Sequence, residues 1–506
     1  MKKTAMILMV IAILSKVIGF SRDLILSYFY GISDLTDAYF ISNTIPTVLF
    51  SVVGLGLLTS FIPVYQKIRL EKGDKHADRF TNNIINIVFL CSVIILILGL
   101  IFTDKLVSIF APGFADDVFD TAIIFTRINL FSILFIGHIY IIVGYLNANN
   151  TFVGPSIRSI AFNITLITFI FLSYFFNNAI LLPSGVVVAM LIQFLLLIHY
   201  LRKINYSYSF KLNIKDEYLR KMFYMSLPIM ISVSINQINV IVDKSIASEI
   251  LQGGISSLTY ANIIYLLVDG IIIVTLLSIV FPKLNNSYIN KQIKVFICLI
   301  KEIQKYFVIV IIPITIILIY FSYEIVNIIY GRGSFDKSDV KLTAGNLSLY
   351  SIGIIGFALR DLYSKAFYAM ENTKIPMINA TIALFINIIL NFVLSSIFGI
   401  GGLALATSIS GIVAAILIGY SLNKKVKIFS FDNFFINSLK FIVLNSVFFI
   451  TLVVTDKILS NYFFSFISLV LSSLISICFY VILLSVFKLV RIEKIISKIV
   501  SFNKKK

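Results

Sequence analysis

Fourteen apolar segments, each about as long as a bilayer-spanning helix, constrain this chain more than any other feature of its sequence. Only 13% of its 506 residues are charged and 59% are hydrophobic, whereas soluble domains carry about 25% charged residues. We therefore predict an all-α polytopic membrane protein with fourteen transmembrane helices. The predicted spans cover residues 5–21, 37–65, 84–102, 121–146, 152–175, 180–200, 222–248, 258–282, 306–323, 343–369, 376–397, 401–422, 433–455 and 462–487.

Basic residues are concentrated in alternate connections between these spans. Lys and Arg gather at the two termini and in connections such as 66–83, 201–221 and 283–305, whereas connection 103–120 is acidic. Basic connections mark the cytoplasmic side, so we expect both termini in the cytoplasm. The net charge of +18 is then mostly a topology signal, and no nucleic-acid partner is expected. The N-terminus resembles a secretory signal, but Lys16 interrupts its apolar run, so we interpret it as a retained span.

An internal repeat relates the first six spans to the next six. Three pairs of short sequences recur in the same order and at nearly the same spacing, and each pair occupies corresponding spans. They are Phe61-Ile62-Pro63 with Val280-Phe281-Pro282, the YLNANNTFVGP segment 145–155 with the YAMENTKIP segment 368–376, and Gly185–Ala189 with Gly402–Ala406. The repeat predicts two six-helix lobes in parallel orientation, an arrangement in which transporters place their substrate between the halves.

The repeat predicts a division of the chain into three parts. Residues 1–221 form an N-lobe, residues 222–432 form a C-lobe, and residues 433–506 hold the last two spans and a basic cytoplasmic tail. The last two spans lie outside the repeat. They either add lipid-facing packing or form a groove for an acyl chain.

Charged residues inside the spans point to a polar cavity, because a charge at membrane depth is costly unless it is paired or faces water. The candidates in the first two spans are Lys16, Arg22 and Asp37. Each has an alternative explanation: Lys16 can extend to the membrane surface, Arg22 can pair with Asp23, and Asp37 can cap a helix start.

A second group of charges lies in span ten, where Arg360, Asp361 and Lys365 occur together. Asp361 and Lys365 are four residues apart and can pair on one helix face. A cavity lined with Lys and Arg suits an anionic substrate, above all a phosphate or pyrophosphate.

The sequence contains no motif for nucleotide binding, metal binding or covalent catalysis. No glycine-rich nucleotide loop, firm metal site or nucleophile–base pair is present, and Cys91, Cys298 and Cys478 each sit in an apolar run. We therefore expect neither an enzyme nor a tightly bound cofactor.

Several stretches resemble the MurJ (MviN) family of lipid II flippases, within the multidrug/oligosaccharidyl-lipid/polysaccharide exporter superfamily. They are SKVIGFSRD (15–23), TDAYF (36–40), APGF (111–114), YLNANNTFVGP (145–155), YGRGSFD (330–336), RDLYSKAFYAMENTKIPM (360–377) and GGLALATSIS (401–410). The resemblance implies two six-span lobes and a two-span groove for the lipid tail. It also implies translocation of undecaprenyl-pyrophosphate-linked peptidoglycan precursor from the inner to the outer leaflet.

The resemblance also assigns site residues. It places the family's functional cations on Lys16 and Arg22 and its span-two acid on Asp37. Two basic positions of the family have no counterpart, because Phe50-Ser51 and Ile263 stand there instead.

Some members resemble sodium-coupled carriers, and the matching residues here are Asp243, Asn387, Asn391 and Thr407, with the Leu403 carbonyl. Oxygen ligands suit a hard cation such as Na⁺. Asn391 replaces a carboxylate of the family, and bonding between helices explains these polar residues equally well.

We therefore expect a lipid II flippase in the bacterial cytoplasmic membrane. It would bind a lipid-linked anionic glycan and membrane lipids, work as a monomer near cell-wall synthases, and use Na⁺ or the membrane potential as its driving force. A flippase for another lipid-linked glycan, of the capsule, teichoic or O-antigen type, is the alternative that the missing arginines favour. A drug/cation antiporter would need an acidic cavity, and a glycan polymerase would need larger outer loops.

Overall fold

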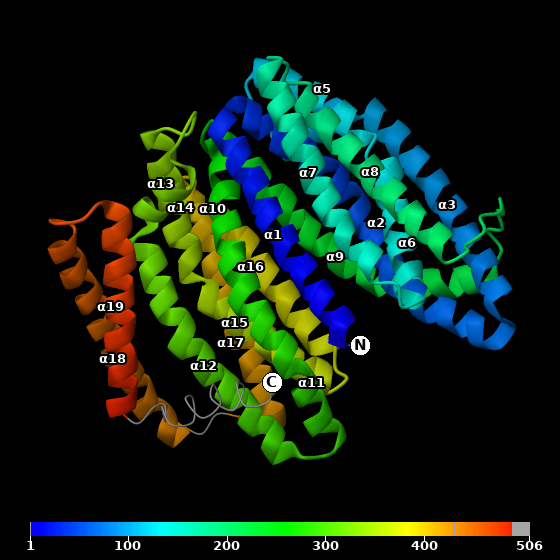
Figure 1. Cartoon of the computed structure of the whole chain (residues 1–506). Helices are drawn as coiled ribbons and strands as arrows, with labels where there is room; N and C mark the ends of the chain where they lie inside the picture. The colour runs from blue at the N-terminus through cyan, green and yellow to red at the C-terminus, as the bar shows by residue number, and fades with distance from the viewer. Residues whose placement is uncertain (1, 429–430, 488–506) are drawn as a thin grey trace. The chain divides into compact units, whose positions relative to one another are not determined.

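The computed structural model describes residues 2–428 and 431–487, and this part of the chain is helical with no β-strand (Figure 1). The helices are α1 (Lys2–Tyr30), α2 (Asp34–Lys72), α3 (Asp74–Ile101), α4 (Thr103–Phe110), α5 (Asp116–Leu130), α6 (Ile133–Ala148), α7 (Val153–Phe175), α8 (Leu181–Lys203), α9 (Glu217–Ile250), α10 (Gly254–Val268), a π-helical turn (Asp269–Ile273), α11 (Val274–Ile289), α12 (Ile293–Tyr320), α13 (Ser322–Tyr330), α14 (Lys337–Ile352), α15 (Ile354–Ala369), α16 (Lys374–Phe398), α17 (Gly401–Val426), α18 (Phe431–Leu459) and α19 (Ser465–Val486).

Twelve of the described helical segments are long and apolar enough to cross a membrane. The count rises to thirteen if α5 and α6, which meet at a bend of 42°, form one broken span. The first predicted span falls in α1, which is not among these segments. The prediction of an all-α polytopic chain is therefore confirmed. The basic tail predicted at 488–506 lies outside the described residues.

Packing divides the described chain into two units. The first comprises the chain up to Ile263 together with Tyr330–Asp339 and Leu384–Leu403, and the second comprises the remainder. The lobe boundaries predicted at 221 and 432 rest on sequence symmetry rather than on packing, so this division does not test them.

Helix α2 is the centre of the first unit, where it packs against α3, α5, α6 and α9 (Figure 1). Its buried face carries Phe50, Phe61 and Tyr65, which join residues of α3 and α6 in one apolar cluster. Gly54 allows α6 to approach closely, because a Cβ there would lie 2.6 Å from the Tyr140 ring. Helix α1 packs on α7, and α7 packs on α8.

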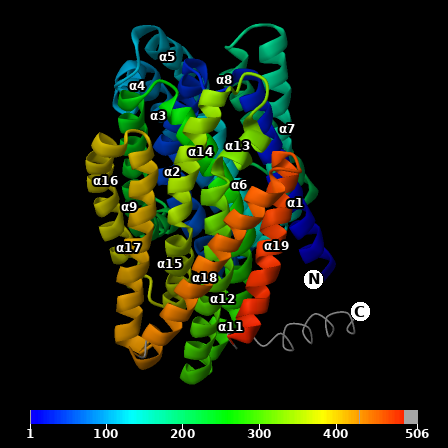
Figure 2. The same cartoon turned by 90° about the vertical axis from the view of Figure 1, so that its left-hand side faces the viewer.

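The second unit contains a helical pair, α18 and α19, that packs against α12 (Figure 2). The contact is formed by Phe321, Leu444, Phe448 and Tyr480, which are almost completely buried. Many other apolar side chains of α18 and α19 are exposed, as expected of a pair that faces lipid.

Three asparagines of α3 hold the segment that connects α8 to α9. Asn83 clamps one residue on both sides: its Nδ2 donates to the Asn213 carbonyl (2.8 Å) and its Oδ1 accepts from the Asn213 N–H (2.6 Å). Asn86 donates to the Lys211 carbonyl (2.8 Å), and Asn82 accepts from the Tyr206 hydroxyl (2.5 Å). We call residues 205–213 the strap.

Replacing Asn83 with alanine should release the end of the strap. Each lost hydrogen bond is worth about 1 kcal/mol, so the Asn213 amide should exchange with solvent at least about tenfold faster. Hydrogen–deuterium exchange of the purified protein measures this change. The exposed Asn461, replaced in the same way, should leave exchange in the strap unaltered. Unchanged exchange at residue 213 in the Asn83 variant would show that the two hydrogen bonds from Asn83 do not stabilise the strap.

A loop between α13 and α14 closes over the end of α1 and thereby positions the helix that carries Arg22. The Ser334 N–H donates to the Tyr28 carbonyl (2.8 Å), and its hydroxyl donates to the Phe29 carbonyl (2.9 Å). Both carbonyls belong to the last turn of α1, where carbonyl groups have no hydrogen-bond donor within the helix. The Asp336 carboxylate accepts from the Asp339 N–H (2.8 Å), which lowers the pKa of this exposed acid.

Gly333 lets this loop approach α1, and replacing it with alanine should destabilise the protein. Its φ of +65° lies in the left-handed region, and a Cβ would overlap the Tyr28 carbonyl. We expect a loss of more than about 1 kcal/mol, seen as a lower thermal midpoint. Gly345 is the matched control, because it lies within α14 and a Cβ there meets nothing within 4 Å. Gly345→Ala should keep or raise the midpoint, and equal midpoints for both variants would contradict this account.

Candidate functional site

Arg22 lies on α1 at the edge of a pocket in the first unit. Its Nη2 and Nε both donate to Asp23 Oδ1, at 2.6 Å and 2.9 Å. Its Nη1 donates to Asn163 Oδ1 on α7 at 3.0 Å. The Arg22 side chain keeps 27% of its surface exposed, whereas that of Asp23 keeps 9%. The pairing with Asp23 that we considered as an alternative is present, and the guanidinium still faces the pocket.

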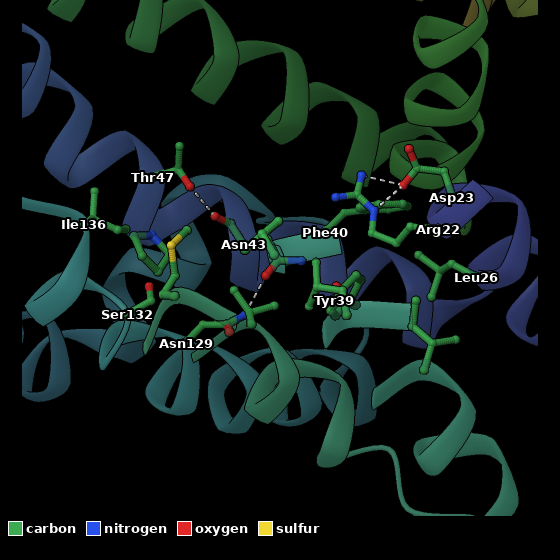
Figure 3. Close-up of a pocket in the computed structure, with 16 residues that line it drawn as sticks. Arg22, Asp23, Leu26, Tyr39, Phe40, Asn43, Thr47, Asn129, Ser132 and Ile136 are labelled. Carbon is green, nitrogen blue, oxygen red and sulfur yellow. Dashed lines mark hydrogen bonds and ion pairs between the residues drawn. The ribbon is translucent and has the colours of Figure 1, made fainter. Parts of the chain in front are cut away.

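The pocket encloses about 240 Å³ between α1, α2, α5, α6, α7 and α8 (Figure 3). Arg22 and Asp23 lie at one end, and Asn129 and Ser132 lie at the other (Figure 3). Most of the wall between these ends is apolar. It is formed by Leu26, Phe40, Ile136, Phe162, Leu166, Ile170, Val186 and Met190.

Lys16 and Arg22 do not share a helix face. Six residues separate them on α1, which turns their side chains roughly 120° apart around the helix axis. Lys16 is exposed and does not line the pocket. The two cations predicted for one cavity are therefore not brought together by this pocket.

Asp37 is buried, with 2% of its surface exposed, and does not line the pocket. Its Oδ1 accepts from the Ser256 N–H at 2.7 Å, in the first turn of α10. The carboxylate thus caps another helix, where the unpaired N–H groups and the helix dipole favour a negative charge. The sequence suggested a capping role for Asp37 but not that the helix would be α10.

Arg360 and Lys365 lie on α15 in the second unit, and each has a different partner from the one that spacing suggested. Asp361 pairs with Arg360 (Nη2 to Oδ1, 2.7 Å) rather than with Lys365 four residues away. The Lys365 Nζ lies over the Phe281 ring, 5.1 Å from its centre. Such contacts reduce the cost of placing a cation in an apolar environment.

The candidate cation residues are partly brought together in the first unit. Asn391 Nδ2 on α16 donates to Asp243 Oδ1 on α9 at 2.5 Å, and it also lies 3.3 Å from Asn387 Oδ1. Asn239, one turn before Asp243, donates to the other carboxylate oxygen at 3.1 Å. Thr407 lies on α17 in the second unit.

The groups around Asp243 include two amide oxygens that have no hydrogen-bond donor within the described chain. Asn391 Oδ1 and Asn239 Oδ1 are buried and have no donor among the described residues. Carboxylate and amide oxygens are the ligands that such ions prefer. No group of three or more His, Cys, Asp or Glu residues that could hold a metal occurs in the described part of the chain.

Sequence reasoning missed four asparagines that shape these sites: Asn43, Asn129, Asn163 and Asn239. Each is an amide side chain within an apolar helix. That signal was available, because a buried amide in a membrane helix needs a partner. Which partner it finds depends on helix packing.

Phe50 and Ser51, which stand at positions where the resemblance led us to expect basic residues, are buried in the first unit. Phe50 belongs to the apolar cluster between α2, α3 and α6. This position therefore contributes packing rather than positive charge.

Comparison with known proteins decides between the alternatives. The family model "Lipid II flippase MurJ" matches residues 26–490. The probable lipid II flippase MurJ of Buchnera aphidicola subsp. Schizaphis graminum is 31% identical over 421 residues, which cover 82% of each chain. This chain belongs to the lipid II flippase MurJ family. The lipid II flippase MurJ of Thermosipho africanus is 29% identical over 439 residues, covering 86% of this chain and 88% of that protein.

The MurJ fold is also evident in solved structures. A lipid II flippase MurJ in an inward closed conformation matches with a TM-score of 0.83 and 28% identity, over 96% of this chain and 100% of that chain. An inward-facing multidrug transporter of the MATE family, described as a member of the MOP superfamily, matches with a TM-score of 0.68 at 14% identity, over 81% of this chain and 98% of that chain. The second likeness shows a shared fold alone.

Membership of the MurJ family has two consequences. With about twelve apolar helices of spanning length, this chain is a multi-pass protein of the bacterial inner membrane. The comparisons do not favour a flippase for another glycan or a drug antiporter.

Proposed function

We propose that this chain translocates lipid II, the lipid-linked peptidoglycan precursor, from the cytoplasmic to the outer leaflet. The match to the lipid II flippase family over residues 26–490 carries this conclusion. The partly exposed Arg22 guanidinium at the edge of a pocket in the first unit supports it, because a pyrophosphate is the group that such a cation binds well.

The test of this function is depletion of the protein in a cell that has no other flippase. Labelling of lipid II on the outer face should fall, while lipid II accumulates on the inner face. Normal labelling after depletion would refute the proposed function.

We propose that α1 is the remaining span, which makes fourteen with α5 and α6 counted as one. An even number of spans places both termini on one side, and the basic connections favour the cytoplasm. A reporter fused to either terminus should then be protected from reagents added outside the cell.

The substrate site performs binding and release rather than covalent chemistry. In the proposed mechanism Arg22 exchanges its contact with Asp23 for the substrate pyrophosphate, and Asn163 holds the guanidinium in place. We propose that Lys16, Asp37, Arg360 and Lys365 add charge along the path. The lipid tail stays in the bilayer, along the exposed apolar faces of α18 and α19.

We propose that Na⁺ is the coupling ion and that Asp243, Asn387 and Asn391 hold it. The buried oxygens of Asn391 and Asn239 that have no donor support this assignment. The ion would add positive charge beside Asp243, a carboxylate inside a membrane helix that also has Lys244 next to it. We further propose that the protein works as a monomer, close to the synthases that use its product.

A further inference from the structure

Arg158, on α7, is a cation of the first unit that has no acidic partner. Its Nη1 donates to Oε1 of the buried Gln193 on α8 at 3.0 Å. Its Nε is enclosed and has no acceptor among the described residues. Arg22 and Arg360 each pair with a neighbouring carboxylate, whereas Arg158 forms no ion pair with a described Asp or Glu. A cation at membrane depth is costly without a countercharge, so its presence points to an anionic ligand.

Arg158 lies on the pocket face of α7 rather than on the lipid face. It is four residues before Phe162 and eight before Leu166, which both line the pocket, so the three residues share one side of the helix. The exposed Ile164 is six residues away, which places it about 120° around the helix axis. Arg158 is therefore not placed to extend along a lipid-facing surface, as an interfacial anchor would be.

Two further helices contribute residues to the same level. On α6, Tyr140 follows Ile136 by four residues and lies close enough to interact with the charge of Arg158. On α8, Gln193 follows Met190 by three residues, and its Nε2 donates to the Met190 Sδ at 3.6 Å. Because Ile136 and Met190 line the pocket, Arg158, Tyr140 and Gln193 form the next turn beyond it, about 5.4 Å along the helices. We call these three residues the arginine layer.

The arginine layer lies beyond the end of the pocket that is away from Arg22. Ile136 is at that end, opposite Arg22 and Asp23 (Figure 3). From the layer, α8 continues to Lys203 and the basic connection that we expect in the cytoplasm. Arg158 is half-buried, and its Nη2, unlike its Nε, is neither enclosed nor bonded to a described acceptor, so a ligand can reach it.

We propose that Arg158 is a phosphate-binding residue that receives the pyrophosphate of the substrate on the cytoplasmic side of the pocket, before Arg22 binds it. The inference rests on the proposed function, which supplies the pyrophosphate. Gln193 holds the guanidinium by Nη1 and leaves Nη2 to donate to a phosphate oxygen in a charge-assisted hydrogen bond. Asn163, which holds Arg22, is five residues further along α7. About 8 Å of helix therefore separates the two contacts, and one pyrophosphate can pass from the first to the second.

Replacing Arg158 with methionine tests this role with two probes, lipid II and undecaprenyl pyrophosphate, which carries neither sugar nor peptide. Methionine keeps an unbranched side chain and removes the charge. Binding of each probe to the purified full-length protein is measured in detergent. We expect both probes to bind at least about tenfold more weakly and by similar factors, because both carry the pyrophosphate. The control Arg202→Met removes an exposed arginine at the end of α8 and should bind both probes as the parent protein does.

Three results would overturn this assignment. Unchanged affinity for lipid II would remove Arg158 from the path of the substrate. Weaker binding of lipid II alone would place Arg158 against its sugar or peptide rather than its pyrophosphate. Weaker binding of phosphatidylglycerol together with unchanged binding of lipid II would identify a phospholipid headgroup as the ligand. A parent protein that binds neither probe would instead refute the proposed function.

A second variant separates loss of charge from loss of folding. Arg158→Lys keeps the positive charge, so it should bind undecaprenyl pyrophosphate within about threefold of the parent protein. This comparison also decides the outcome if Arg158→Met lowers the thermal midpoint. Equal weakening by lysine and methionine, at a normal midpoint for the lysine variant, would show that the charge of Arg158 does not bind the phosphate.

Discussion

Replacing Arg22 with alanine should stop the appearance of lipid II on the outer face of the membrane. The guanidinium is the positive group closest to the pocket. Removing a cation that holds a phosphate weakens the binding free energy of the phosphate by about 2–5 kcal/mol. The rate of flipping should fall by more than about tenfold. Outer-leaflet labelling of lipid II in a strain that depends on the variant measures this rate.

Two further variants separate loss of binding from loss of folding. Arg22→Ala leaves Asp23 buried without its partner, which by itself can destabilise the protein. The double variant Arg22→Ala/Asp23→Asn removes both charges and should be equally inactive at a normal expression level. Arg127 forms an exposed pair with Asp104, so Arg127→Ala should retain flipping. Normal flipping by the double variant would exclude Arg22 from the substrate site.

Replacing Asp243 with asparagine should weaken the response of flipping to Na⁺. The Asp243 carboxylate accepts hydrogen bonds from Asn391 and Asn239. Asparagine at position 243 would lack the negative charge that attracts a cation. In the parent protein, Na⁺ should accelerate flipping. In Asp243→Asn, the Na⁺ concentration for half-maximal rate should rise by at least about tenfold. Flipping in vesicles at fixed membrane potential and varied Na⁺ concentration provides the measurement.

The control for this experiment is a carboxylate outside the cluster. Asp104 is exposed, with 63% of its side-chain surface free, so Asp104→Asn should respond to Na⁺ as the parent protein does. A normal Na⁺ response in Asp243→Asn would assign coupling to other residues. A parent protein that flips lipid II equally well without Na⁺ would remove the coupling role altogether.

The asparagines show why parts of the site could not be predicted. The sequence marks Asn129, Asn163 and Asn239 as amides within apolar helices, and each must find a partner. Nothing in the local sequence says that Asn163 on α7 would meet Arg22 on α1, or that Asn129 on α5 would donate to Ser42 and Asn43 on α2. These pairings depend on helices that are far apart in the sequence.

The charged residues of span ten also have partners that the sequence did not predict. Spacing along a helix favours a pair between Asp361 and Lys365, which are four residues apart. The folded chain pairs it with Arg360 and places Lys365 over aromatic rings. Local geometry defines the options, and the neighbouring helices select among them.

The sequence by itself determined the helical, membrane-spanning character of the chain, because hydrophobic length and charge placement are properties of each segment alone. Through its motifs it also indicated the family and predicted Arg22 as a site residue. Only the tertiary structure decided that Asp37 caps α10 and that Arg22 lies beside a pocket in the first unit. The physical reason is that a buried polar group is stabilised by whichever partner the packing of distant helices brings within hydrogen-bonding distance.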